Sequence, residues 1–246
     1  MAEIAPQGNG RPEDLSLAIK AILSNADRLA EEAMDLGDYG RTQTGFFLSV
    51  LAREEFAKGF LLILAQEERL PWTTRFQDAL RSHKCKQLVS HILCELSAVD
   101  LFDPKYIGKW PRRVRELPRP VVDAFNILVH EHLGDLERED WWYKEEDPPI
   151  DPTVHEVAAG AVERRKQDVL YVRIGWNGSP RNDPAKPLAQ SEWQRERRRL
   201  GLMKDAFWVS QGRLSGSPAA QYSLISALIR VLAGLLSPEE YDRDWA

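Results

Sequence analysis

Four charged side chains lie in the middle of the longest apolar stretch of the sequence, residues 45–65, and are the first candidates for chemistry: Arg53, Glu54, Glu55 and Lys58. Glu54 and Glu55 precede Lys58 by four and three residues, so a helix would bring these three charges together. Burying an ion is costly unless it is paired. We therefore expect either that function uses the cluster or that its hydrogen bonds fix how helices pack. The sequence leaves both interpretations open.

His83 is the second candidate, within the segment RSHKCK at residues 81–86. An imidazole takes up and releases protons near neutral pH, and Lys86 follows three residues later on the same helical face. The opposing interpretation is a structural role, which is the commoner one for a lone histidine. His130 and His132 stand two residues apart, so a helix cannot direct both of them to one point.

Several familiar site motifs do not occur in the sequence. It has no HExxH, no paired ExxH, no CxxC and no P-loop, the patterns that hold zinc, a di-iron pair or nucleotide phosphates. We therefore expect no metal and no cofactor. Basic runs at 109–115, 164–166 and 195–199 could follow a phosphate backbone, or they could be solvated helix faces balanced by nearby acidic residues.

Three helices are expected to position these residues in the amino-terminal half. Apolar residues recur at spacings of three and four, which predicts helices at about 12–37, 41–70 and 73–99. Pro71 ends the second, because the residue before a proline resists helical geometry. This second helix is apolar almost all round, which is typical of the central helix of a bundle.

The remaining sequence predicts a less regular half. One strand cannot form a sheet alone, so the alternating apolar pattern near residue 172 predicts a small hairpin or an edge against loops. The expected elements are a basic, proline-rich connector at 100–120, a helix at about 121–138, an acidic loop at 144–152 after Trp141 and Trp142, a helical turn or two at 158–166, the strand pattern at 169–174 before the Asn177-Gly178 turn, a basic helix opened by a capping box at 191–194, and helices opening at Ser217 and Ser237.

Composition limits the class of protein. The chain has 246 residues, 43% of them hydrophobic, and a formal net charge of −5, which favours one folded, soluble domain over a disordered chain. The stretch at 45–65 is long enough to cross a bilayer, but its central charges make that costly. Two cysteines make no disulfide framework and the amino terminus has no secretory pattern, so we expect a cytoplasmic protein.

An ordered set of short motifs resembles the AbiV family of bacterial abortive-infection proteins. The set covers most of the chain, from about residue 15 to 235. Its members are the turn GDYGRT at 37–42, REEFAK at 53–58, SHKCK at 82–86, RRKQDVLYV at 164–172 and Ser179-Pro180. No one of these motifs is specific by itself; their order along the chain makes the resemblance.

This resemblance implies membership of the HEPN-like helical superfamily. Its enzymes are typically metal-independent RNases, built as homodimers with the active site at the dimer interface. Their motif is an arginine, four to six residues, then a histidine. This sequence departs from that spacing, because seven residues separate Arg75 from His83 and one separates Arg81 from it.

The resemblance also assigns roles to the candidate residues. It implies that His83 acts as general base or acid when a ribose 2′-hydroxyl attacks the adjacent phosphate. Charge in the transition state would be stabilised by a nearby cation. The candidates for that cation are Lys58, Lys86 and Arg53, and those for the carboxylate that orients them are Glu54 and Glu55.

The sequence thus predicts a mainly α, HEPN-like helical bundle with a small β-hairpin or irregular insertion in its carboxyl-terminal half. We expect a flexible terminus at 1–12 and one domain at 13–246. Within the domain we expect a three-helix core at 13–100, a loop-rich insertion at 101–187 and final helices at 188–246. The predicted function is antiphage defence by a metal-independent endoribonuclease or RNA-binding effector, with RNA, a phage protein trigger and a second copy of the chain as partners. The alternative is a non-enzymatic helical scaffold that binds a phage or host protein.

Overall fold

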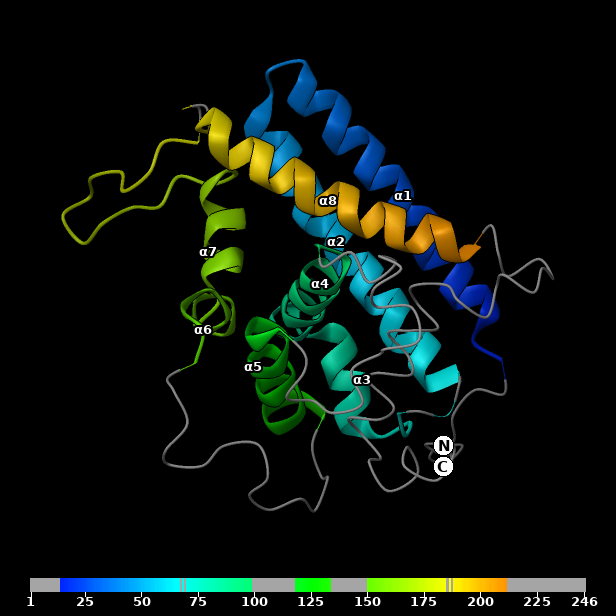
Figure 1. The fold of residues 1–246 in the computed structure, drawn as a ribbon. Coiled ribbons are helices and arrows are strands. Elements are labelled where there is room, and N and C mark those ends of the chain that lie inside the picture. The colour runs from blue at the N-terminus through cyan, green and yellow to red at the C-terminus, as the bar shows by residue number, and fades with distance from the viewer. Residues whose placement is uncertain are drawn as a thin grey trace, which may run out of the picture.

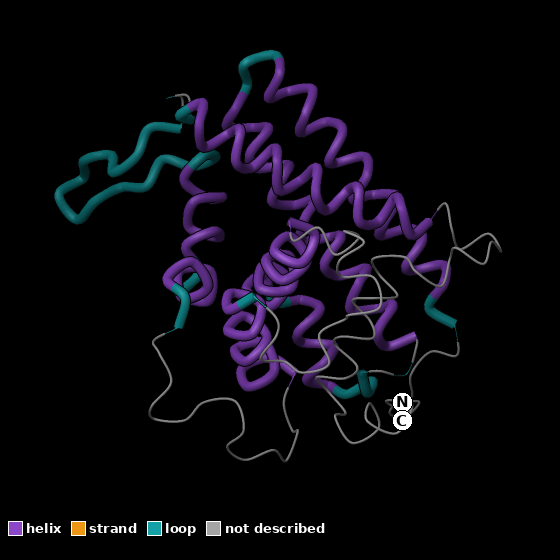
Figure 2. Tube along the Cα trace, viewed as in Figure 1, coloured by secondary structure: helices purple, strands orange, loops and turns teal. Residues whose placement is uncertain are grey.

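The protein is mainly α-helical, as the sequence predicts (Figure 1, Figure 2). The structure is a computed structural model that describes residues 14–66, 68, 70–98, 118–133, 150–184, 186 and 188–211. These residues contain no strand. In chain order their helices are α1 Ser16–Asp38, α2 Thr42–Gln66, α3 Thr74–Arg81, α4 His83–Ala98, α5 Arg119–Ile127, the π-helical turn η2 Leu128–Leu133, α6 Pro152–Ala158, α7 Ala161–Asp168 and α8 Gln190–Gln211.

The first two helices form an antiparallel pair with an unusually close backbone approach. A Cβ atom at Gly45 would come within 2.9 Å of the Ala33 carbonyl oxygen, and one at Gly59 within 2.7 Å of the Leu23 side chain. Small residues at the contact therefore allow the axes of α1 and α2 to lie this close. They recur every seven residues on α2, at Gly45, Ala52 and Gly59, and every three or four on α1, at Ala26, Ala30, Ala33 and Gly37.

Helix α2 is the central helix of the bundle. It contacts α1, α4, α7 and α8, and its apolar side chains are buried on several faces, Phe56, Phe60 and Leu64 among them. This explains why its sequence shows no single apolar stripe. The helix ends at Gln66, four residues before the predicted end, and Glu68 adopts a positive φ of 59°.

The predicted third helix at 73–99 is wrong in one respect, because the structure divides it into α3 and α4. Ser82 lies between them in an extended conformation, with φ −67° and ψ 120°. Its hydroxyl oxygen accepts a hydrogen bond from the Cys85 backbone N–H at 3.2 Å, which is the geometry of a helix N-cap. His83 is therefore the first residue of α4 rather than a mid-helix residue.

The segment after residue 118 contains more helix than the sequence predicts. The helix expected at 121–138 begins at Arg119 and passes into the π-helical turn, and its expected end lies outside the described residues. The turn or two expected at 158–166 is α7, and a helix that the sequence analysis does not predict, α6, precedes it. Gly160 separates them with a φ of 79°, and the Asp151 carboxylate caps α6 by accepting from the Thr153 backbone N–H at 2.9 Å.

The strand pattern at 169–174 does not become a strand. A single antiparallel bridge joins Ile174 to Pro180 across the Asn177-Gly178 turn, and one bridge with no neighbouring strand is too short to count as a hairpin of strands. The irregular insertion, rather than the β-hairpin, is what the described residues contain. This segment projects from the body of the protein between α7 and α8 (Figure 1, Figure 2).

The last described helix, α8, lies across α1, α2 and α4. It begins at Gln190, so Ser191 lies inside the helix and the capping box predicted at 191–194 is wrong. Trp193 is buried against Gly37 of α1. Other predicted features lie outside the described residues, namely the basic connector, the pair Trp141 and Trp142, most of the acidic loop, and the helices expected after Ser217 and Ser237.

None of the helices in the described residues is long and apolar enough to cross a membrane. Helix α2 has the necessary length, but Arg53, Glu54, Glu55 and Lys58 interrupt its apolar stretch. This finding agrees with the prediction that the chain has no membrane-spanning segment.

The contact between Gly37 and Trp193 gives a stability prediction. A Cβ atom at Gly37 would lie 1.8 Å from a carbon of the Trp193 ring, so Gly37→Ala must displace a buried indole. We expect it to lower the free energy of unfolding by about 1–3 kcal/mol, measured by urea denaturation. Gly201→Ala is the matched control, because nothing lies within 4 Å of a Cβ there and alanine stabilises a helix by up to about 1 kcal/mol. Equal effects of the two changes would contradict this account of the packing.

Candidate functional site

A histidine and a carboxylate from different helices form the centre of the site. The Nδ1 atom of His83, at the start of α4, lies 2.6 Å from Oε2 of Glu54 on α2. Glu54 is buried, whereas 49% of the His83 side chain is exposed. The Lys166 ammonium, which can only donate, also lies 3.4 Å from Nδ1, but the contact with Glu54 is much the shorter. An ionised carboxylate can only accept, so we assign the hydrogen to Nδ1 as donor to Glu54. The other ring nitrogen of a neutral His83, Nε2, is then left as a base.

Two lysines, one from α7 and one from α4, supply cations to the same carboxylate. Lys166 of α7 places its Nζ 3.2 Å from Glu54 Oε1, and Lys86 of α4 places its Nζ 3.7 Å from Glu54 Oε2. The Gln87 amide also donates to Glu54 Oε1 at 2.8 Å. Both lysines are buried. The buried carboxylate is thus compensated from two sides, which a buried ion requires to be tolerated.

Glu163 completes the charge balance at the outer edge of the site. Its Oε2 atom lies 2.6 Å from the Lys166 ammonium and 3.9 Å from His83 Nδ1. Burial alone would raise the pKa of the Glu163 carboxyl, but the hydrogen bond and charge of Lys166, the hydrogen bond from Gln167 and the nearby His83 leave that pKa below its ordinary value. Two carboxylates therefore face two ammonium groups around one imidazole.

The three groups Glu54, His83 and Glu163 could in principle hold a metal ion, since one ligand atom from each lies within 4.8 Å of the others. The Lys166 ammonium lies between the two carboxylates, at 2.6 Å and 3.2 Å from their oxygens. An ammonium in that place already supplies the cation that two carboxylates need, and a metal would have to displace it. The donor set fits proton transfer better than metal binding.

Arg53 is adjacent to Glu54 in sequence but belongs to a separate buried cluster. Its Nε donates to Glu196 of α8 at 2.7 Å, and its Nη1 donates to the Ser90 hydroxyl at 2.9 Å. Burial alone would lower the pKa of the Arg53 guanidinium, but the Glu196 carboxylate outweighs burial and raises it. Ser49 also donates to Glu196, at 2.5 Å. This cluster ties α2, α4 and α8 together and has no exposed side chain.

Glu55 and Lys58 lie near the surface. Their charged ends are 3.7 Å apart, and the two side chains are 23% and 32% exposed. Among the described residues, this is the ion pair that Lys58 makes. The structure therefore brings together Glu54, His83 and Lys86 of the six predicted site residues, and it places Arg53, Glu55 and Lys58 in two other settings.

The sequence analysis did not select Lys166, Glu163 and Gln87 for the site. Lys166 belongs to the basic run at 164–166, a pattern that is also typical of a solvated helix face. One signal was available: Val162 and Val169 stand four residues before and three after Lys166, which places the lysine on the apolar side of a short helix. Val169 and Lys166 are both buried. Nothing in the sequence indicated which carboxylate this lysine would meet.

A pocket of about 330 Å³ lies elsewhere, where the end of α7 meets the start of α8. The charged groups at its rim are largely paired. Arg165 donates to both carboxylate oxygens of Glu192, at 2.7 Å and 2.9 Å, and Asp168 binds Arg173 at 2.5 Å. None of the predicted site residues lines this pocket, so it is not the candidate site.

The family of the chain follows from comparison with known proteins. The HEPN-type family described as AbiV matches residues 14–199. The chain belongs to the AbiV family. This confirms the resemblance found in the sequence motifs, and it suggests an HEPN-type protein of abortive infection. No curated protein and no solved structure gives a significant match. The matched residues of this AbiV-family chain include the whole cluster of Glu54, His83, Lys86, Glu163 and Lys166.

The buried pair of Arg53 and Glu196 gives a prediction for this AbiV-family protein. Arg53→Met would leave Glu196 buried without its cation, and we expect a loss of about 3–5 kcal/mol in the free energy of unfolding. The double variant Arg53→Met/Glu196→Met should recover most of that loss, because neither charge remains. Lys58→Met, which removes a surface partner, should change stability by less than about 1 kcal/mol. Urea denaturation would measure all three variants. If Arg53→Met lowered the free energy of unfolding no more than Lys58→Met does, the buried ion pair of Arg53 and Glu196 would be contradicted.

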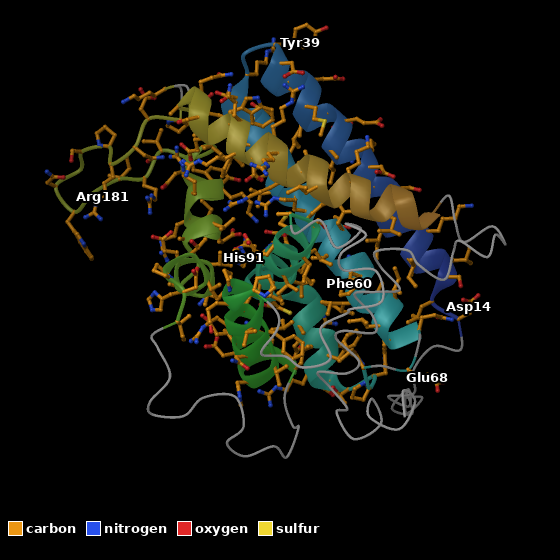
Figure 3. All side chains as sticks on the ribbon, viewed as in Figure 1. Asp14, Tyr39, Phe60, Glu68, His91 and Arg181 are labelled. Atoms are coloured by element: carbon orange, nitrogen blue, oxygen red, sulfur yellow. The ribbon has the colours of Figure 1, made fainter. Side chains whose placement is uncertain are left out.

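His91 gives a prediction about pH. It is buried on α4 (Figure 3), and burial, with the charges of Arg199 and Arg53 outweighing that of Asp151, lowers its pKa from 6.5 to about 4. Between these values the unfolded chain binds more protons than the folded one, so stability should fall as pH falls from 6.5 to 4. The contribution is at most about 3 kcal/mol.

His91→Gln should flatten this pH dependence when unfolding by urea is measured at a series of pH values. His155→Gln is the matched control, since His155 is exposed on α6. The same slope in the wild type and in His91→Gln would show that another group causes the pH dependence.

Proposed function

We propose that this AbiV-family protein acts in antiphage abortive infection as a metal-independent endoribonuclease with His83 as its acid–base residue. The observation that supports this most directly is the hydrogen bond of 2.6 Å between a half-exposed imidazole and a buried carboxylate. Such a carboxylate fixes the tautomer and orientation of the ring and stabilises the imidazolium that forms when the ring takes up a proton.

The proposed reaction is an internal transesterification of RNA. His83 Nε2 takes the proton of a ribose 2′-hydroxyl, and the 2′-oxygen forms a bond to the adjacent phosphorus. The bond from phosphorus to the 5′-oxygen breaks, and that oxygen takes a proton from the imidazolium. The products are a 2′,3′-cyclic phosphate and a 5′-hydroxyl, and His83 returns to its neutral form. No metal enters any step.

Lys86 acts on His83 through Glu54, and Lys166 acts both through Glu54 and by its own contact of 3.4 Å with His83 Nδ1. Lys86 and Lys166 are at most 7% exposed, so they do not face solvent as phosphate ligands would, and we assign them to positioning the carboxylate. A phosphate would instead meet the exposed Lys84 and the first backbone N–H groups of α4. Those of His83 and Lys84 have no partner among the described residues, and a helix amino terminus favours an anion.

The expected partners and compartment belong to the same proposal. They are RNA as substrate, a phage protein as trigger, a second copy of the chain at a shared site, and the cytoplasm as the place of action. Arg53, Glu55 and Lys58 have no assigned part in the step, since Arg53 is buried against Glu196 and the other two pair with each other.

The second candidate function is a non-enzymatic scaffold that binds a phage or host protein. The observation that favours it is how fully the polar clusters compensate themselves. Glu54 bonds to groups from α4 and α7, and Arg53 bonds to groups from α4 and α8. In this case the two clusters fix the packing of α2, α4, α7 and α8. His83 then only covers the outer end of the Glu54 cluster.

Cleavage of RNA by purified protein is the test. His83→Ala should lower the rate by about 10²–10⁴-fold, the usual share of general acid–base catalysis, while urea denaturation shows a folded protein. His155→Ala, an exposed histidine of α6, should cleave as the wild type does. Gel separation of total RNA, with end-group analysis for the cyclic phosphate and with EDTA present, would measure the effect.

The two candidates predict different results for Lys166→Met. An endoribonuclease should lose activity, because Glu54 loses one of the groups that position it beside His83. A scaffold should change only in stability. Cleavage that His83→Ala leaves unchanged would remove His83 from the mechanism, and a wild-type protein that neither cleaves nor binds RNA would favour the scaffold.

A further inference from the structure

Residues 170–184, which we call the arm, carry an apolar pattern that the proposed function does not use. Their alternating residues resemble a strand in the sequence, yet the structure leaves them in solvent. Ile174 is 63% exposed, Val172 is 53% exposed, and Trp176 is as exposed as in an extended chain. The arm projects from the bundle between α7 and α8, with Arg181 on it (Figure 1, Figure 3).

One edge of the arm is already paired. The Arg173 carbonyl accepts from the Arg181 N–H at 2.7 Å, and the Gly175 N–H donates to the Ser179 carbonyl at 2.7 Å. The Asn182 side chain continues this pairing, since its Oδ1 accepts from the Arg173 N–H at 2.6 Å and its Nδ2 donates to the Tyr171 carbonyl at 2.6 Å. The odd-numbered residues therefore turn their backbone groups inward, toward the returning segment.

The opposite edge is open. Backbone groups alternate in direction along an extended chain, so Val172 and Ile174 direct their N–H and C=O outward. In the part of the chain that the structure describes, these four groups have no hydrogen-bond partner. An extended edge of this kind is a template for a strand from another chain.

The side chains favour the same partner geometry. Val172 and Ile174 are spaced by two, so an extended backbone places them on one face, and Trp176 follows them in the turn, fully exposed. Val172 and Ile174 are aliphatic and β-branched, the residue type that packs best across paired strands. Nucleic acid would use the aromatic ring and the cations but could not pair with the backbone edge. The pattern therefore favours a protein strand over RNA.

Charge indicates the composition of that strand. Arg173 is paired with Asp168. Arg181 and Lys186 are exposed, form no ion pair among the described residues and outnumber the one exposed carboxylate between them in sequence, Asp183. Pairing two copies of the arm would bring like charges together, which is unfavourable. An acidic strand would meet opposite charges instead.

We propose that the arm is a docking site for an extended, acidic segment of a partner protein, which adds as a strand along Val172 and Ile174. Main-chain hydrogen bonds to the open edge would provide affinity. Alternate apolar side chains of the partner would cover Val172, Ile174 and Trp176, and its acidic residues would lie near Arg181 and Lys186. This site is separate from His83, so the inference goes beyond the proposed function.

The test uses a fluorescein-labelled peptide of eight residues that alternates Glu and Val, titrated with the full-length protein and followed by anisotropy. We expect binding that Ile174→Asp weakens by at least about tenfold. Leu17→Asp is the matched control, because Leu17 is an exposed apolar residue on α1, and it should bind as the wild type does. Hydrogen exchange should show slower exchange of the Val172 and Ile174 N–H groups when the peptide is bound.

Two altered peptides separate the contributions. N-methylation at alternate residues removes the hydrogen bonds to the edge, and exchange of Glu for Lys reverses the charge; each should weaken binding by at least about tenfold. Equal binding of the N-methylated peptide would overturn strand addition, as would no binding of the parent peptide up to about 1 mM. His83→Ala should bind the peptide normally even if it cleaves no RNA.

Two further results would also overturn the proposal. The first is a wild-type dimer, seen by light scattering, that Ile174→Asp dissociates, because the arm would then pair with a second copy. The second is a labelled oligouridylate that binds the arm more tightly than the acidic peptide and competes with it, because the arm would then be an RNA contact.

Discussion

The buried carboxylate of Glu54 is the constraint on which the rest of the site depends. A carboxylate in the middle of an apolar helix must be paired or hydrogen-bonded. Its partners come from α4 and α7, which are 29 to 112 residues away in sequence. Satisfying one anion therefore fixes where two other helices lie against α2, and it places the imidazole of His83 at the boundary between core and solvent.

A second constraint makes that arrangement possible. Helix α2 packs closely on its other sides, where small residues face α1 and Arg53 faces α8. The two neighbouring charges, Arg53 and Glu54, leave the helix in different directions and bind different helices. Together their partners tie three helices, α4, α7 and α8, to α2.

The same helices also determine what reaches the surface. The cluster around Lys166 anchors α7 to the core, and the Arg165 pair with Glu192 joins α7 to the start of α8. The arm begins where α7 ends and returns before α8 starts, so its two bases are held while its tip extends into solvent. A rigid base with an open edge is the arrangement that lets a loop present backbone groups to a partner.

Much of the fold can be predicted from the sequence, and three of the six predicted site residues, Glu54, His83 and Lys86, lie together in the structure. Periodicity places α1 and α2, and the all-round apolar character of α2 identifies the central helix. The sequence pattern does not predict the break between α3 and α4 at Ser82, because the apolar spacing continues through it. The hydrogen bond of the Ser82 hydroxyl decides the local geometry. The expected strand failed for the opposite reason: its pattern is right, but within the described residues no neighbouring strand pairs with it.

By itself the sequence determined which residues needed a partner, because Arg53, Glu54 and His83 carry charge or exchange protons in apolar surroundings. It also determined the family, through motifs in a fixed order. Only the tertiary structure decided which residues pair with Arg53, Glu54 and His83. Lys166 and Glu196 lie within runs of charged residues in the sequence, and the partner that each one meets depends on how distant helices dock. Helix formation is governed by neighbours within four residues, whereas the pairing of buried charges is governed by distances in space that no local pattern encodes.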